Sequence, residues 1–413
     1  MSRAPKQSKA HPFPVSHELE VRIVSLSNQG DGVAKIDIPA KNIKQWVIFI
    51  PFTIPGEEVH IRITSNKKNC SLAELVAVNK PSVFRVEPRC SLFTVCGGCQ
   101  YQHMDYQMQL TEKTQQIEQL LQRLAGVEFA VNDTVASPRE YAYRSKLTPH
   151  FHKPYNGKIS QIGFVSKLKS RDYVDVINCP IAVDEINEAL PEVRQHAKDS
   201  AKSYKKDHTI LMRAAEGKVT TNESTVIKET VNEVDFHFLA GDFFQNNPFI
   251  LPAFVDYASK QAKGDNCNYL VDTYCGSGLF ALTLAKDFKH VTGVEISETA
   301  TDWAKQNARL NGIENTSFLA ASAEAIFKNI DHPAEETTVL IDPPRAGCSS
   351  DFREQLFKFS PKKVVYVSCD PATQMRDLTY FVDHGYDVSD VQPFDLFPQT
   401  KHLECIITLE KKS

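Results

Sequence analysis

The sequence has no long apolar run and no strong excess of charge of either sign. No stretch approaches the roughly 18 consecutive apolar residues that a membrane span needs, so we expect no membrane segment. The net charge of −4 argues against a generally basic nucleic-acid-binding protein, although a local basic surface can still bind RNA. The first ten residues lack the apolar core of a signal peptide, and we therefore expect a cytoplasmic protein, or a nuclear one in a eukaryotic cell.

A disulfide framework and internal repeats are also missing. Ten cysteines in 413 residues are too few for a disulfide-stabilised scaffold, and in a reducing compartment they favour metal-binding or catalytic roles. The length exceeds what one hydrophobic core supports, so we predict two or three domains. The hydrophobic share of 42% and the charged share of 24% are ordinary for a globular enzyme, and we expect a monomer of that kind.

Residues 17–79 contain short alternating strands separated by the turn signals Gly30-Asp31-Gly32 and Pro55-Gly56. Such regular spacing predicts a small β-barrel of the oligonucleotide-binding kind. Four lysines fall in its loops or strand ends: Lys41, Lys44, Lys67 and Lys68. They form either an ordinary solvated surface or a face that holds RNA phosphates.

A cysteine motif follows the predicted barrel. Cys90, Cys96 and Cys99 fall within ten residues, the last two on either side of a glycine pair, and glycines let the backbone wrap closely around one centre. Cys179, which precedes a proline, is the best fourth ligand. Four thiolates fit zinc or a 4Fe–4S cluster, and the three-plus-one spacing favours iron–sulfur because zinc sites more often use two close pairs. The alternative is a set of unligated buried cysteines.

Residues 80–240 predict a central α+β domain. Apolar residues recur at helical spacing from Tyr106 to Leu124 and the pattern ends at Gly126, so we expect a helix over 106–125 that can pack on the following domain. Residues 141–146 and 167–171 interleave cations with aromatic or apolar residues. That mixture suits RNA contact, but an exposed sheet edge explains it equally simply.

From residue 241 onward strands and helices alternate, which predicts a parallel sheet. A strand over 269–274 runs into the glycine-rich turn Cys275-Gly276-Ser277-Gly278, and the next strand, over 291–295, ends in Glu295. A glycine turn at a helix amino terminus with a ribose-binding acid after the next strand indicates an adenosine cofactor. The turn lacks the full dinucleotide fingerprint, so S-adenosylmethionine fits better than NAD.

Two more strands end in chemically suggestive residues. A strand over 337–341 is followed by Asp342-Pro343-Pro344-Arg345, and we expect its prolines to form a stiff loop over the carboxyl ends of the strands. A strand over 364–368 ends at Cys369, before a helix that starts at Pro371. Ligands of open α/β sheets bind at the carboxyl ends of strands, so Cys369 is a candidate nucleophile and a buried structural cysteine is the alternative.

Several motifs together resemble the S-adenosylmethionine-dependent RNA uracil-5-methyltransferases, and details such as Tyr274-Cys275-Gly276-Ser277-Gly278-Leu279-Phe280 are most similar to the tRNA branch. The motifs are the cysteine cluster, the cofactor turn, Asp342-Pro343-Pro344-Arg345, Ser368-Cys369, and Phe397-Pro398-Gln399-Thr400 followed by Glu404. The resemblance implies an α/β fold with a Rossmann-like class I methyltransferase domain over 241–413, a central α+β domain over 80–240, and an OB-like TRAM barrel over 17–79 that binds RNA.

The same resemblance implies a reaction and a set of site residues. The implied reaction is methyl transfer to carbon 5 of a uridine, and the similarity to the tRNA branch favours the T-loop uridine of tRNA as the substrate. The alternatives are the same reaction on a ribosomal RNA uridine, or a relative that binds RNA without catalysis. Cys369 is implied as the nucleophile and Glu404 as the proton acceptor, while the implied cofactor contacts are Gln245, Tyr274, Glu295 and Asp342. The implied ligands of a 4Fe–4S cluster are Cys90, Cys96, Cys99 and Cys179. Leu279 departs from many bacterial relatives, which often place an asparagine there, and leaves one cofactor contact open.

Overall fold

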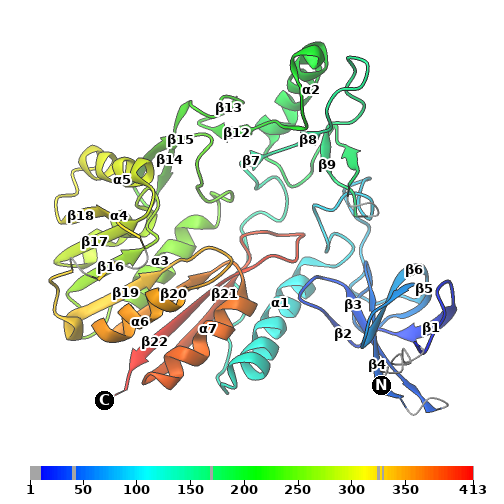
Figure 1. Cartoon of the computed structure of the whole chain (residues 1–413), viewed down its shortest axis with the longest axis horizontal. Helices are drawn as coiled ribbons and strands as arrows, with labels where there is room; N and C mark the ends of the chain where they lie inside the picture. Colours follow the sequence, from blue (N-terminus) through cyan, green and yellow to red (C-terminus); the bar gives the residue numbers. More distant parts are fainter. Residues whose placement is uncertain (1–10, 40–42, 168–170, 323–325, 328–329, 413) are drawn as a thin grey trace, which may run out of the picture.

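The computed structural model of the protein describes residues 11–39, 43–167, 171–322, 326–327 and 330–412 (Figure 1). Lys41 and part of the basic segment 167–171 lie outside these ranges.

The amino-terminal part is a six-stranded sheet in the order β1-β5-β6-β4-β3-β2 that closes around its own apolar core. Alternate residues such as Ile61 and Ile63 point inward and are fully buried, as expected where one face of each strand is covered. This agrees with the small barrel predicted from the strand spacing. The strands are β1 (Glu18–Arg22), β2 (Ser25–Leu26), β3 (Gly32–Ile38), β4 (Ile43–Ile50), β5 (Glu58–Asn66) and β6 (Cys70–Lys80).

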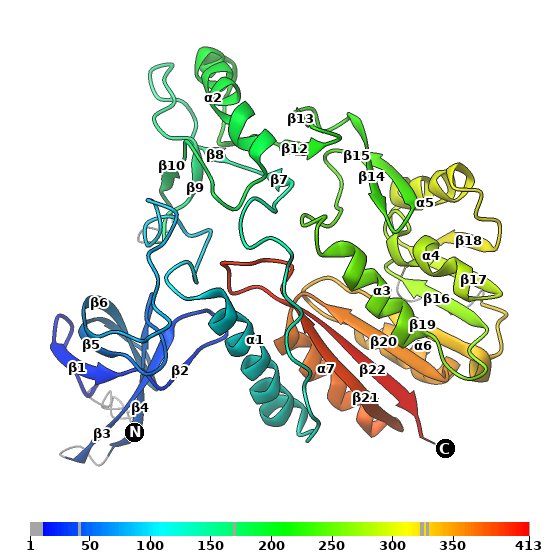
Figure 2. The same ribbon diagram turned by 180° about the vertical axis from the view of Figure 1, so that it is seen from behind.

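A helix, α1 (Tyr106–Leu120), follows the cysteine motif and is prolonged by a π-helical turn over Leu121–Ala125. Asp105 caps its first turn, and Gly126 ends the π-helical turn in the left-handed conformation that favours glycine. Ile117 and Leu121 pack into the apolar cluster beneath the sheet of the carboxyl-terminal part. Both views show α1 lying between the barrel and α7 (Figures 1 and 2).

The central part is built from short antiparallel strands around α2 (Asp184–Asp199), with a core that includes Phe151 and Leu190. A hairpin of β14 and β15 joins it to the carboxyl-terminal part through Asn307 of α5 (Glu298–Leu310) and Asn311, the residue that follows this helix. The strands are β7 (Lys146–Leu147), β8 (His150–Phe151), β9 (Gly163–Val165), β10 (Tyr173–Asp175), β11 (His208–Thr209), β12 (Met212–Ala215), β13 (Lys218–Thr220), β14 (Val226–Val231) and β15 (Val234–Leu239).

The carboxyl-terminal part contains a seven-stranded sheet in the order β18-β17-β16-β19-β20-β22-β21. The five strands from β18 to β20 are parallel, and β22 and β21 complete the sheet in antiparallel pairing. The elements are α3 (Leu251–Ala262), β16 (Tyr269–Thr273), α4 (Leu279–Leu284), β17 (His290–Glu295), α5 (Glu298–Leu310), β18 (Thr316–Ala320), β19 (Thr337–Ile341), α6 (Ser350–Phe359), β20 (Lys363–Ser368), α7 (Pro371–Asp383), β21 (Tyr386–Phe394) and β22 (Glu404–Lys411).

Both faces of this sheet are covered, as its parallel strands require. Successive residues of β20 enter opposite cores: Val365 packs with α3 and α4, whereas Tyr366 packs with α6 and α7. The architecture is the Rossmann-like α/β fold predicted from the alternation of strands and helices, and its strand ends position the candidate site.

Candidate active site and cysteine pocket

One edge of the sheet collects the ends of five neighbouring strands. Ile341 of β19 pairs with Thr273 of β16 and with Tyr366 of β20, so the residues that follow these strands meet at the same edge. Ser368 pairs with Cys405 in the antiparallel register of β20 and β22. Five of the six predicted catalytic and cofactor residues therefore lie along this edge, in the sheet order Glu295, Tyr274, Asp342, Cys369 and Glu404.

The Glu295 end of this edge has the form of a cofactor cradle. The Glu295 carboxylate accepts hydrogen bonds from the backbone N–H groups of Gly276, at 3.1 Å, and Ser297, at 2.9 Å. Gly276 has a left-handed φ of 54° and open space where a Cβ would stand. The backbone at Gly276 is thus held by the carboxylate and is not covered by a side chain, so a ligand can approach it closely.

Asp272 also faces this turn, and sequence reasoning assigned it no role. Its carboxyl is fully buried; Oδ2 accepts the backbone N–H of Ala281 at 2.8 Å, whereas Oδ1 has no partner among the described residues. Burial raises the pKa of this carboxyl well above its usual range. An acid inside the apolar strand over 269–273 is a signal from which the residue could have been found.

Two further predicted cofactor residues are Tyr274 and Gln245. Tyr274, directly before the glycine turn, is a non-glycine residue with a left-handed φ of 63°, a strained conformation that is common at functional sites, and its ring packs against Phe352. Gln245 is buried. It follows Phe244, whose ring stacks on that of Phe238 in β15, so Gln245 lies beside the β14–β15 hairpin, and its contact with the cofactor stays a prediction.

Cys369 and Glu404 stand one residue beyond the Ser368–Cys405 pair, on adjacent strands. Burial raises the pKa of the Cys369 thiol to about 11, and the charges of Glu404 and Asp342 add to this effect. Burial raises the pKa of Glu404 well above its usual range and that of Asp342 to about 7. Burial therefore favours the protonated form of both the nucleophile candidate and the base candidate.

Arg345 opposes this effect, although sequence reasoning gave it no role beyond its motif. Its guanidinium hydrogen-bonds the Cys369 thiol, and both this bond and its charge lower the thiol pKa. Its Nη2 also lies 3.5 Å from Nδ1 of His402. The loop that carries Arg345 is fastened by Arg376, whose Nη2 donates to the carbonyl oxygen of Ala346 at 2.9 Å. The site thus contains a cation near its thiol.

A loop over residues 395–403 leads into Glu404 and is anchored on α1. Lys113 Nζ lies 2.7 Å from Asp395 Oδ1, and both side chains are fully buried. Gln109 donates from Nε2 to Gln399 Oε1 at 3.0 Å and accepts the backbone N–H of Gln399 on Oε1 at 3.1 Å. Gln399 itself has a left-handed φ of 68°. These anchors were missed because the partners are almost 300 residues apart in the sequence.

A cavity of about 280 Å³ opens in front of Cys369. Its walls come from three parts of the chain: Asn28 and Gln29 of the barrel, Gln116 and Leu120 of α1, and the catalytic edge with Arg345 and His402. Burial and the nearby cations lower the pKa of His402 to about 4, so its imidazole is neutral near pH 7. The cavity volume is near the lower end of the range of about 300–1,000 Å³ for ligand pockets, enough for one nucleoside.

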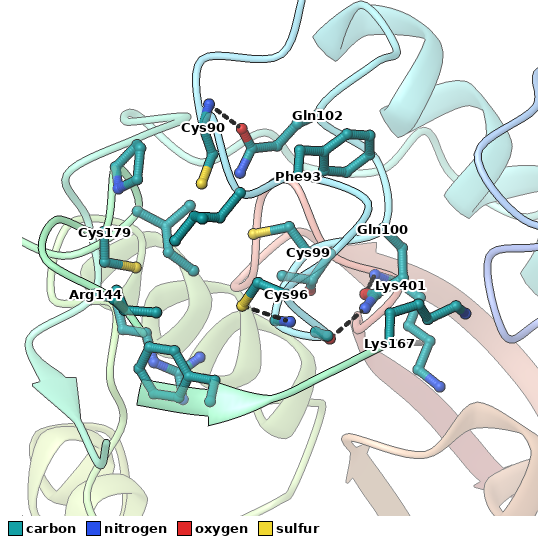
Figure 3. Close-up of a pocket in the computed structure, with 18 of the residues that line it drawn as sticks. Cys90, Phe93, Cys96, Cys99, Gln100, Gln102, Arg144, Lys167, Cys179 and Lys401 are labelled. Atoms are coloured by element: carbon teal, nitrogen blue, oxygen red, sulfur yellow. Dashed lines mark hydrogen bonds between the residues drawn. The ribbon is translucent and has the colours of Figure 1, made fainter. Parts of the chain in front are cut away.

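The four predicted metal-binding cysteines line a second cavity of about 620 Å³. The thiol groups of Cys90, Cys96, Cys99 and Cys179 turn toward the same space (Figure 3). The positions of Cys96 and Cys99 are fixed by the glycine turn, where Gly97 N donates to Val165 O at 2.9 Å and Gly98 N to Cys96 Sγ at 3.4 Å. Across the described residues, no group of three or more His, Cys, Asp or Glu is arranged to hold a metal ion.

Some lysines of the predicted RNA-contact segments are exposed, whereas others bond to other parts of the protein. Lys44, Lys67 and Lys68 are exposed on the barrel. By contrast, Lys146 donates to the carbonyl oxygens of Gly241 and Asp242, both at 3.1 Å, and Lys167 pairs with Asp31 at 3.3 Å. The segment over 141–146 therefore connects parts of the protein as well as presenting charge.

Comparison with known proteins decides the family. The family model described as tRNA (Uracil-5-)-methyltransferase matches residues 195–412. The tRNA (uracil(54)-C(5))-methyltransferase of Schizosaccharomyces pombe is 38% identical over 97% of this chain and 79% of its own length. The chain belongs to the tRNA (uracil-5-)-methyltransferase family. The family and the class of enzyme predicted from the motifs are thereby confirmed.

Further comparisons match the barrel and nearly the full length of the methyltransferase. A TRAM domain model matches residues 14–76, which contain the barrel. The tRNA (uracil(54)-C(5))-methyltransferase of Saccharomyces cerevisiae is 30% identical over 98% of this chain and 76% of its own length. The crystal structure of Pyrococcus abyssi tRNA (uracil-54, C5)-methyltransferase in complex with S-adenosyl-L-homocysteine has a TM-score of 0.70 at 23% identity, covering 95% of this chain and 100% of that one. This last likeness confirms the predicted fold.

None of the helices in the described part of the methyltransferase has the length and apolar character needed to cross a membrane.

Proposed function

We propose that this methyltransferase transfers a methyl group from S-adenosylmethionine to carbon 5 of the T-loop uridine of tRNA, at position 54, through a covalent adduct with Cys369. The observation that carries the proposal is the placement of Cys369 and Glu404 beyond one strand pair, on the edge that also holds Tyr274 and Glu295. The names of the two yeast relatives support the substrate and the position.

The residues of the cofactor turn fit an adenosine. The Glu295 carboxylate lies at the end of β17, where an acid can accept ribose hydroxyl hydrogen bonds; its hydrogen bonds with Gly276 and Ser297 hold the turn open. Oδ1 of Asp272, which has no partner among the described residues, offers a further acceptor near the start of α4. Gln245, Tyr274 and Asp342 would complete the site. When bound, S-adenosylmethionine supplies an electrophilic methyl group.

Cys369 and Glu404 divide a difficult substitution into easier steps. Carbon 5 of uracil is a poor nucleophile. Addition of the Cys369 thiolate to carbon 6 forms an enolate whose carbon 5 carries the electron pair for methyl transfer. Glu404, as a carboxylate, then accepts the proton left on carbon 5, and the carbon 6–sulfur bond breaks to return the thiolate. Arg345 favours the thiolate at the start and at the end of this sequence.

The uridine must leave its stack to reach Cys369, as is general for enzymes that act on bases. The cavity in front of Cys369 lies between the barrel, α1 and the sheet edge, and its volume suits a single nucleoside. The exposed lysines of the barrel, Lys44, Lys67 and Lys68, are proposed phosphate contacts outside this cavity.

The cysteine pocket is proposed to hold a 4Fe–4S cluster with a structural role. A single zinc ion draws four sulfurs into one tight tetrahedron, whereas in a cubane cluster each thiolate binds its own iron and the sulfurs stand further apart. Four thiols that face one cavity of about 620 Å³ fit the larger cluster better. Cys90, Cys96, Cys99 and Cys179 would be its ligands.

The proposal is tested with purified protein, S-adenosylmethionine and unmodified tRNA. Wild-type protein should form 5-methyluridine in the T loop, Cys369→Ala should form none, and Glu404→Gln should accumulate a protein–RNA adduct on denaturing gels. Cys70→Ala, a change in strand β6 of the barrel, is the matched control and should remain active. Activity in Cys369→Ala would contradict covalent catalysis. Absence of 5-methyluridine from the tRNA incubated with wild-type protein would contradict the proposed substrate.

A further inference from the structure

The barrel contributes one wall of the cavity that contains Cys369. Its contribution is the turn over residues 27–31 between β2 and β3, whose Asn28 and Gln29 line the cavity together with Arg345, Cys369 and His402. Asn28 and Gln29 are the exposed residues of a turn that is otherwise at least partly buried. The barrel is thus placed to contact the reacting nucleotide, in addition to any phosphates outside the cavity.

The turn is held firmly enough to position a side chain. It is closed by backbone hydrogen bonds of 2.8 Å between Ser27 and Asp31 and between Gly30 and Ser27. Gly30 has a φ of 80° and lies against Tyr101, where a Cβ would come within 3.0 Å of the ring. Asp31 pairs with Lys167. The turn is therefore fixed from the barrel, from the segment that follows the cysteine motif, and from the central part.

The orientation of the Gln29 amide follows from its partner. Gln29 Oε1 accepts a hydrogen bond from Lys401 Nζ. An ammonium group can only donate, so it selects the oxygen of the amide and leaves the NH₂ group, which can only donate, as the free end. Uracil presents carbonyl oxygens at carbons 2 and 4, whereas cytosine has an NH₂ group at carbon 4.

We propose that Gln29 is a specificity-determining residue that donates a hydrogen bond from Nε2 to the carbonyl oxygen at carbon 4 of the uracil that reacts with Cys369. The proposal rests on the proposed function, because it assumes that a uridine enters this cavity. A donor fixed in this way binds the carbonyl at carbon 4 of uracil. The amine at carbon 4 of cytosine would instead place two donors opposite each other, which disfavours cytosine.

The test combines two substitutions of Gln29 with modified RNA. Gln29→Met removes the amide at nearly constant length, and Gln29→Glu keeps the Lys401 partner but replaces the donor by an acceptor. Each should lower kcat/KM for a T-loop stem–loop RNA about tenfold, as expected for one lost hydrogen bond. Gln45→Met, at an exposed glutamine of the β3–β4 hairpin outside the cavity, is the matched control and should leave kcat/KM unchanged.

A cycle with thio-substituted RNA separates a base contact from a structural effect. Sulfur at carbon 4 of the target uridine weakens the proposed acceptor, so it should lower kcat/KM more in wild type than in Gln29→Met, whereas sulfur at carbon 2 should affect both proteins equally. Equal effects of sulfur at carbon 4 in both proteins, or variants within twofold of wild-type kcat/KM, would overturn the proposal without contradicting the proposed function. Wild-type protein that methylates no RNA would overturn both, and S-adenosylmethionine binding and melting temperature verify that the variants fold.

Discussion

Cys369 is surrounded by groups with opposite effects on its ionisation. Burial and the charges of Glu404 and Asp342 raise the pKa of the thiol to about 11, whereas Arg345 lowers it. Since the thiolate is the nucleophile, Arg345 and the two carboxyls together determine what fraction of the Cys369 thiol is ionised. This balance can be measured without RNA or cofactor.

Asp342→Asn should increase the reactivity of Cys369, and Arg345→Met should decrease it. At pH 8 Asp342, with a pKa of about 7, is mostly ionised, so removing its charge lowers the thiol pKa; removing the Arg345 cation raises it. We expect changes of about tenfold in either direction in the rate of alkylation by iodoacetamide, the equivalent of one pKa unit. The rate is measured by mass spectrometry of the peptide that contains Cys369.

The effect of Asp342→Asn should shrink below pH 7, where the native carboxyl is already neutral. Cys70, which lies in the barrel, is the internal control, and its alkylation rate should be the same in all three proteins. An unchanged Cys369 rate in both variants at pH 8 would contradict the electrostatic coupling.

Glu404→Gln should stabilise the protein above neutral pH. The carboxyl of Glu404 is buried and its pKa is raised in the folded state, so the unfolded state loses its proton at lower pH and stability falls as pH rises from the unfolded toward the folded pKa. Removing the ionisable group should add about 1–3 kcal/mol to the free energy of unfolding at pH 8. Denaturant titrations at pH 8 and pH 4 measure it. A gain of the same size at pH 4 would point to packing instead.

Individual site residues were predictable from the sequence to different degrees. Cys369, Glu404 and Glu295 could be named because each stands at a strand end within a distinctive motif, although their roles stay predictions. The contribution of Arg345 could not be derived, since it depends on the tertiary placement of the loop after β19 beside Cys369 at the end of β20. The strained φ of Tyr274 likewise leaves no trace in residue type.

At the scale of elements, α1 links the central part to the catalytic loop. Periodicity predicted the helix and its apolar stripe. The structure packs Ile117 and Leu121 of that stripe onto the catalytic sheet, whereas Leu124 is exposed. Sequence patterns would place Gln109 and Lys113 on a solvated face, yet both are fully buried. Their partners, Gln399 and Asp395, lie 290 and 282 residues further along the chain, and local periodicity cannot reveal such pairing.

Lys113→Met should weaken both stability and methyl transfer. It leaves Asp395 buried without its cation, a change that typically costs about 3–5 kcal/mol, and it loosens the loop over 395–403 that leads into Glu404. We expect a loss of that size in denaturant unfolding and a lower kcat with unchanged S-adenosylmethionine affinity.

Glu118→Gln is the matched control for this change, because Glu118 is exposed on the same helix and should shift stability by less than about 0.5 kcal/mol. Lys113→Met with wild-type kcat would show that the loop does not need this anchor.

At the scale of the whole molecule, the cysteine pocket and the active site share one set of backbone contacts. The N–H groups of Gln100 and Tyr101 both donate to the carbonyl oxygen of Gln399 at 3.0 Å, and Gln100 Oε1 accepts the N–H of Lys401 at 3.1 Å. Lys401 and His402 line both cavities. The segment that carries Cys99 therefore also supports the loop that leads to Glu404.

Cys99→Ser should remove the proposed cluster and slow catalysis together. Losing one of four thiolates should abolish iron and sulfide binding, because the site closes only with all its ligands. Without that closure the segment over 97–101 holds Gln399 and Lys401 less firmly, so kcat should fall while the thiol of Cys369 remains intact. Iron and sulfide analysis with visible absorption after anaerobic purification measures the first effect, and single-turnover methyl transfer the second. Cys70→Ser, the control, should keep its iron and its activity. A colourless wild-type protein that contains zinc would contradict the iron assignment. Full activity in an iron-free Cys99→Ser protein would contradict the coupling of the pocket to the loop over 395–403.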